Sequence, residues 1–343
     1  MQTTQTPTGI ADTGLPADYS AWTLASGRAS VVESQMAGES ALERILQANG
    51  ESKILSQAGD TLLGETLDRE QDLRESEQDI AEGYRSLMKE LREISPDPGV
   101  ADLVLVQREL RSLKNHVKRE HMDLPVSSPP SIYESESWER LWQELATDLP
   151  AIFEKGMERT RDVPGFDPRD PVMFDSSFDG ATLLALREAA EGTDSEMAGE
   201  YFRRYDTTKG VEFIMRARTL GLGDEMTHLL LRDRHHEELF TELQQYAPDA
   251  WPDILSSLLD GIRLEGMEEA EGIERTRAFV RAADRWLMEL VRPALLTAFG
   301  PDRVFGCVVG LEAESYNMRI AVVGRANDMN ADELRDHLRV PYV

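Results

Sequence analysis

The sequence predicts an all-α fold, and three observations lead to this expectation. Apolar residues recur every three or four positions over most of the chain, which is the spacing of one face of a helix. The strict alternation of apolar and polar residues that is typical of strands is nearly absent. Aromatic residues make up 7% of the 343 residues and charged residues 29%, a balance that favours helices over sheets.

Each helix follows from that spacing and from the residues that interrupt it. The apolar positions between Glu65 and Ile94 form one stripe, and the segment 96–99 (PDPG) ends this helix. A second stripe includes residues 106–117, and the proline- and serine-rich segment 124–131 is the clearest linker. Ser137 is suited to cap the next helix, which Pro150 interrupts. Further helices are expected at the following ranges: 181–190, 235–246, 254–262, 275–298, 307–323 and 331–338.

An internal similarity divides the chain into units of roughly 100 residues, the usual size of a domain. Three segments, residues 109–114, 206–216 and 314–319, share an acidic residue followed by apolar and basic positions. Together with the glycine-rich boundary at residues 221–224, this similarity predicts three related helical domains. The expected organisation is a flexible polar tail and three domains, at residues 1–19, 20–125, 126–222 and 223–343.

Composition excludes several classes of function. The formal charge of −27 makes the chain a poor candidate for holding nucleic acid or anionic lipid directly. Cys307 is the single cysteine, so the chain can have neither an intrachain disulfide nor a cysteine-rich metal site. The longest uncharged apolar run, residues 304–311, is far shorter than the ~20 residues that a membrane-spanning helix needs. We therefore expect a cytoplasmic protein that is not inserted into a membrane directly.

Motifs for catalysis or metal binding are weak. The cluster His235–Glu238 and the single Glu225-x-x-His228 pattern could suggest metal ligands, but a di-iron bundle needs two such patterns and two further glutamates. A solvated helix face is the preferred interpretation. The sequence contains no Gly-Lys-Ser/Thr phosphate loop and no Gly-x-Ser-x-Gly elbow. We expect no catalytic residue, no cofactor and no metal.

The C-terminal part carries the most specific pattern in the chain. Residues 310–325, GLEAESYNMRIAVVGR, resemble the KExExxNLRxIxxGK helix of the C subunit of the archaeal and bacterial A/V-type ATPases, the homologue of the eukaryotic V-ATPase d subunit. Residues 330–338 are similar to the closing helix of that family. Further segments match in the family's order; they are residues 28–36, 42–46, 60–64, 170–179 and 206–216. Leu311 stands where the family has lysine, and Ser112 where its first repeat has asparagine.

The resemblance implies a function that no single residue would suggest. Members of that family are non-catalytic, funnel-shaped sockets of three helical domains around a pseudo-threefold axis. Such a socket sits on the cytoplasmic face of the membrane proteolipid ring, receives the axle subunits D and F, and connects indirectly to the A/B head. The implied process is H⁺ or Na⁺ transport. Two alternatives remain, a helical scaffold or regulatory adaptor unrelated to rotary ATPases and an enzyme with a carboxylate–histidine site.

The resemblance and the internal similarity single out one set of positions. They could contact a partner subunit or form hydrogen bonds within their own domain, and we favour the local role because buried polar groups usually satisfy each other. Glu314 and Asn317, three residues apart, share one helix face. The motif positions are Glu109, Lys114, Asp206, Arg216, Glu312, Glu314, Asn317 and Arg319.

Overall fold

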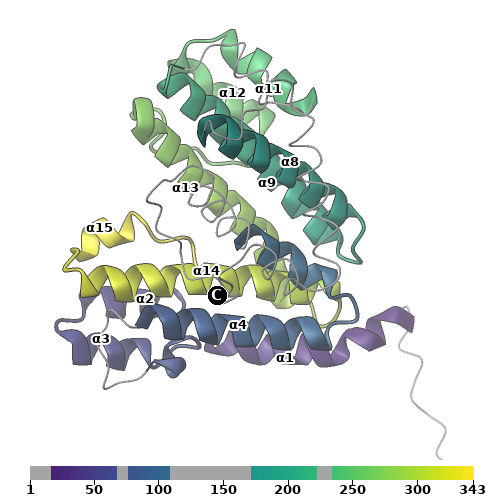
Figure 1. The fold of residues 1–343 in the computed structure, drawn as a ribbon, viewed down its shortest axis with the longest axis vertical. Helices are drawn as coiled ribbons and strands as arrows, with labels where there is room; N and C mark the ends of the chain where they lie inside the picture. Colours follow the sequence, from purple (N-terminus) through teal and green to yellow (C-terminus); the bar gives the residue numbers. More distant parts are fainter. Residues whose placement is uncertain (1–16, 68–75, 109–170, 222–233) are drawn as a thin grey trace, which may run out of the picture.

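The computed structural model describes residues 17–67, 76–108, 171–221 and 234–343, and all regular structure in these ranges is helical. The predicted all-α class is therefore confirmed. The helices form two parts, which we name the body and the arm (Figure 1). The body contains η1 (Ala17–Trp22), α1 (Thr23–Gln35), α2 (Glu39–Gln47), α3 (Glu51–Ala58), η2 (Gly64–Thr66), α4 (Ser76–Ile94), the helical residues 99–108, α14 (Pro301–Ala326) and α15 (Ala331–Arg335). The arm contains α8 (Pro171–Glu191), α9 (Glu196–Thr219), α11 (Arg234–Gln244), η3 (Pro248–Ala250), α12 (Trp251–Leu258), α13 (Gly272–Val291) and η4 (Arg292–Leu296).

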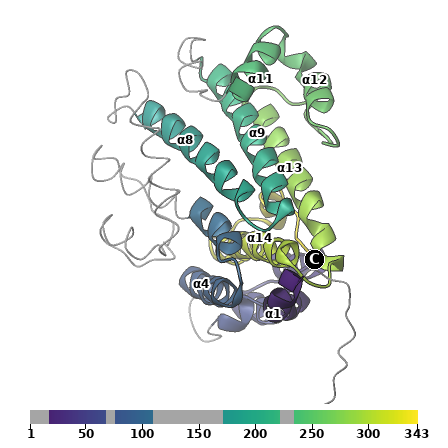
Figure 2. The ribbon, with the colours of Figure 1, turned by 90° about the vertical axis from the view of Figure 1, so that its right-hand side faces the viewer.

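Each part has its own hydrophobic core. The larger core joins α1–α4, residues 99–108 and α14 with the first turns of α9. The smaller core joins the second half of α9 with α11, α12 and α13. Because α9 and α13 contribute to both cores, these two helices link body and arm, and Figure 2 shows them rising side by side from the body.

Helix α14 is the centre of the body. It has 26 residues, most of which are buried, and only a face that includes Glu312, Tyr316 and Arg319 is partly exposed. Pro301 occupies the first helical turn, where its missing N–H costs nothing. Helices α1, α2, α3 and α4 pack along it, so the two ends of the sequence share one core.

The C-terminal segment 336–343 folds back along α14. Tyr342 is 3% exposed, and its ring lies against Gly306 and Gly310, where a β-carbon would collide with it. The Arg292 guanidinium donates hydrogen bonds to the carbonyl oxygens of Pro341 and Tyr342 at 2.6 and 3.3 Å. The two glycines thus provide the groove in which the end of the chain is fixed.

Several predicted helices lie where the sequence pattern placed them, while α8 and α9 differ. The stripe ending at Ile94 is α4, and the predicted helix 307–323 is the middle of α14. Helix α8 begins at Pro171, ten residues before the predicted start, and α9 was not predicted. The helix from Ser137 and the linker 124–131 lie outside the described residues. The predicted domain boundaries near residues 125 and 222 also fall there, so the three domains stay a prediction.

The packing of Tyr342 against α14 generates a stability prediction. Gly310→Ala should lower the free energy of unfolding by about 1–3 kcal/mol, because the added methyl group overpacks the groove. Urea denaturation followed by circular dichroism measures this change. Gly199→Ala is the matched control, since nothing lies within 4 Å of its added carbon; it should stabilise α9 by about 0.5–1 kcal/mol. Equal effects of both substitutions would contradict the packing of Tyr342.

Candidate functional site on helix α14 and in the elbow

Glu314 ties the N-terminal helices to α14. Its carboxylate oxygen Oε2 accepts a hydrogen bond from the backbone N–H of Ala37, in the turn between α1 and α2, at 2.6 Å. The side chain is buried at 4% exposure. Burial raises the pKa of Glu314 to about 7, although the backbone N–H groups of Ala37 and Leu63 oppose this shift. In this conformation the carboxyl group binds the chain's own turns and is not accessible to a partner.

Asn317 holds the returning C-terminal segment. Its side-chain amide donates to the carbonyl oxygen of Arg339 at 3.0 Å, and its side-chain oxygen accepts from the Arg339 N–H at 2.8 Å. Asn317 is 1% exposed, so its side-chain amide is directed to these two backbone groups and not to water. Through these two hydrogen bonds, Asn317 satisfies both backbone groups of Arg339.

The other motif positions on α14 make contacts nearer the surface. Glu312 lies 3.4 Å from the guanidinium of Arg108, in the helical residues 99–108. Arg319 forms an ion pair with Glu77 at the start of α4, with 2.9 Å between Nε and Oε1. Both contacts join α14 to a different helix of the body, and ion pairs of this exposure contribute little to stability.

The motif positions on α9 are not brought together with those on α14. Asp206 is buried and accepts a hydrogen bond from Arg187 of α8 at 2.8 Å. Arg216 is exposed and forms an ion pair with the buried Glu212 one turn away, at 2.6 Å. The remaining two motif positions, Glu109 and Lys114, lie outside the described residues. Whether any motif position contacts a partner stays a prediction.

A buried ionic network was not anticipated from the sequence. Glu33 of α1 is 5% exposed and accepts hydrogen bonds from the Arg303 guanidinium and, at 3.3 Å, from the Tyr342 hydroxyl. Arg303 also donates to the carbonyl oxygens of Ala294 and Leu295. Burial raises the pKa of Glu33 to about 7, against the effects of Arg303 and Tyr342. Only the match of residues 28–36 to the family pattern pointed to this region.

Carboxylates also fix the joint between body and arm. Asp302, in the first turn of α14, accepts hydrogen bonds from the Ser195 hydroxyl at 2.6 Å and from the Met197 N–H at 3.2 Å, at the start of α9. Asp97 accepts a hydrogen bond from the N–H of Asp194 at 3.2 Å. The free N–H groups at a helix start favour such acceptors.

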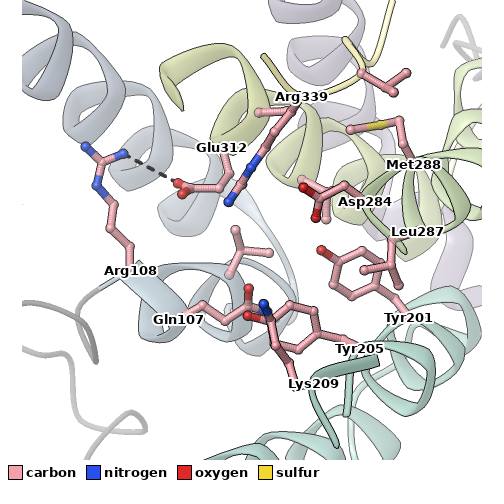
Figure 3. Close-up of a pocket in the computed structure, with 14 residues that line it drawn as sticks. Gln107, Arg108, Tyr201, Tyr205, Lys209, Asp284, Leu287, Met288, Glu312 and Arg339 are labelled. Atoms are coloured by element: carbon pink, nitrogen blue, oxygen red, sulfur yellow. Dashed lines mark hydrogen bonds and ion pairs between the residues drawn. The ribbon is translucent and has the colours of Figure 1, made fainter. Parts of the chain in front are cut away.

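A pocket of about 80 Å³, which we name the elbow pocket, lies where the arm meets the body (Figure 3). Five parts of the chain line it: residues 99–108, α9, α13, α14 and the C-terminal segment. Its charged and polar residues are Gln107, Arg108, Tyr201, Tyr205, Lys209, Asp284, Glu312 and Arg339. Among the motif positions that the structure describes, only Glu312 reaches it, and the sequence pattern gave no sign of a pocket here.

The part of the chain that the structure describes holds no group of three or more potential metal ligands. His235, His236 and Glu237 belong to α11, whereas Glu225 and His228 lie outside the described residues. Within the described ranges, no helix combines the length and apolar character needed to span a membrane.

The buried carboxyl of Glu314 generates a prediction about pH. The folded protein binds the Glu314 proton more tightly than the unfolded chain, whose carboxyl has a pKa near 4.5. This contribution is therefore fully present below pH 4.5 and is lost as the pH rises through about 7. Glu314→Gln should remove this loss, so its unfolding free energy relative to wild type should rise by about 2–3 kcal/mol between pH 5 and pH 8. Glu82→Gln, at an exposed position on α4, is the control, and parallel curves for wild type and Glu314→Gln would refute the assignment.

Asn317 generates a prediction about the C-terminal segment. Asn317→Ala leaves two backbone groups of Arg339 without partners and should cost about 2 kcal/mol of stability. Hydrogen exchange followed by mass spectrometry should show faster exchange in residues 336–343, with little change in α13. Asn327→Ala, which removes an exposed hydrogen bond to Val323, is the matched control and should leave this segment protected. Unchanged exchange in Asn317→Ala would show that the segment is held by other contacts.

Comparison with known proteins gives one match to a family, and this match extends over most of the chain. No curated protein matches the sequence significantly. A family model described as ATP synthase (C/AC39) subunit matches residues 25–337, which include the described helices from α1 to α15 in both body and arm. The complex in which this family works is membrane-associated and transports ions. The chain therefore belongs to the family of ATP synthase (C/AC39) subunits, the structural central-stalk subunits of rotary ATPases.

Proposed function

We propose that this chain is the rotor socket that couples the D/F axle of a rotary A/V-type ATPase to its membrane proteolipid ring. The family match over residues 25–337 is the observation that carries this proposal, because it includes both body and arm. The same resemblance supports a funnel of three helical domains around a pseudo-threefold axis. The chain would lie on the cytoplasmic side of the cell membrane as a peripheral component.

The packing suits a component that transmits torque. A socket must carry strain between two partners, and closely packed helices pass strain on without yielding. In the body, α14 is packed by helices from the N-terminal part of the chain, and in the arm α9 and α13 run side by side. Such a component needs no catalytic residue, and ATP hydrolysis would take place in the A/B head.

The charge of the chain restricts its partners. The cytoplasmic face of a membrane attracts basic segments, whereas this chain has a formal charge of −27. We therefore expect it to bind basic surfaces on the ring and on the axle rather than the lipid itself. Complementary charge would speed the encounter and fix the register more than it would strengthen binding. The transported ion is H⁺ or Na⁺.

Native mass spectrometry tests the proposal. The tagged chain, expressed in its own host and purified from gently solubilised membranes, should be recovered in one complex with the axle subunits, the A/B head and the proteolipid ring. A tagged chain with Arg277→Gln, which alters an exposed ion pair with Glu274 outside the motif positions, is the control for tagging and mutation and should assemble equally. Recovery alone, or with unrelated soluble partners, would reject the socket and favour a helical scaffold or adaptor.

A further inference from the structure

The elbow pocket is lined by charged groups, of which two are already occupied. Arg108 contacts Glu312 at 3.4 Å and donates to the hydroxyl of Ser315 at 2.9 Å. Lys209 donates to Glu212 at 2.7 Å. Because Arg108 and Lys209 are already paired with side chains of this chain, neither needs a ligand to satisfy its charge.

Four other groups of the pocket have no such partner among the described residues. The Arg339 guanidinium lies over the Tyr316 ring, 4.3 Å from its centre, and forms no hydrogen bond or ion pair. Burial lowers the pKa of Arg339, but the nearby charges of Asp284 and Glu312 raise it and outweigh this effect. The Asp284 carboxylate and the Tyr201 hydroxyl likewise have no hydrogen bond in the described ranges. The amide nitrogen Nε2 of Gln107 is buried and unpaired. Figure 3 shows these side chains converging on the pocket from four parts of the chain.

A buried polar group without a partner, such as Gln107 Nε2, is costly. Arg339, Asp284 and Tyr201 are partly buried, and the arrangement of the four groups indicates what could satisfy them. Arg339 and Gln107 supply donors that suit a carboxylate, and the Tyr201 hydroxyl can add a third. Asp284 is an acceptor that suits an ammonium group. A phosphate fits poorly, because Asp284 and Glu312 would repel its second negative charge.

We propose that the elbow pocket binds a small α-amino acid, with its carboxylate on Arg339 and its ammonium group on Asp284. The volume of about 80 Å³ leaves room for one small solute. The ligand would bridge α13 and the C-terminal segment and so stabilise the joint between arm and body. This site is independent of the rotor function, since it uses only contacts within the chain.

Isothermal titration calorimetry of the full chain tests the proposal with two series of probes. Glycine, L-alanine and L-glutamate should bind at millimolar concentrations or below, about tenfold or more tightly than acetate, propionate and glutarate. Inorganic phosphate should bind no better than acetate. Equal affinity for amino acids and simple carboxylates, or no heat with any probe up to roughly 10 mM, would overturn the proposal.

Two variants separate the roles of the charged groups. Arg339→Gln keeps the backbone that Asn317 holds, and it should weaken binding of both series about tenfold or more. Asp284→Asn should remove only the preference for amino acids, and unchanged preference would overturn the role of Asp284. Arg277→Gln, on the same helix as Asp284 but in an exposed ion pair with Glu274, should bind as wild type does. Because no assembly with axle or ring is measured, these outcomes are independent of the test of the socket.

Discussion

Most of the surface of α14 is covered by other parts of the chain, and the rest of the structure depends on this enclosure. The N-terminal helices, the start of α9 and the C-terminal segment all pack against it. Polar side chains on the covered faces cannot turn to water, so each of them needs a partner from the covering elements. Glu314 binds the turn after α1, Asn317 binds the C-terminal segment, and Arg303 binds Glu33.

These polar contacts determine the register in which the covering elements pack. Apolar surfaces alone would allow α1 and the C-terminal segment to slide along α14, because apolar attraction has no direction. Glu314 and Asn317 form hydrogen bonds with the backbone of one specific residue each, Ala37 and Arg339. The Tyr342 ring fits only beside Gly306 and Gly310. A shift by one residue would leave buried groups unpaired, which costs more than the contacts contribute.

Sequence periodicity predicted the helices that have one polar face. Helix α4 is such a helix, and its C-terminal end was foreseen because Pro96 and Pro98 follow it. Helix α9 was missed because it is buried on one side by the body and on the other by the arm, so its apolar residues form no single stripe. The elbow pocket could not be foreseen for a different reason. Tyr201, Asp284 and Arg339 are distant in sequence, and only tertiary packing brings them together.

The joint between arm and body is a packed corner, because α9 crosses it without interruption. Near its start, Phe202 is 1% exposed and lies against Phe305 of α14, with 6.3 Å between the ring centres. The ring of Tyr201 meets the same phenylalanine edge-on at 5.5 Å. Swinging the arm would therefore open a cavity lined by aromatic rings and break the cap that Asp302 provides. Force applied to the arm thus passes through α9 into α14, and both helices also line the elbow pocket, where an occupant would add one more contact.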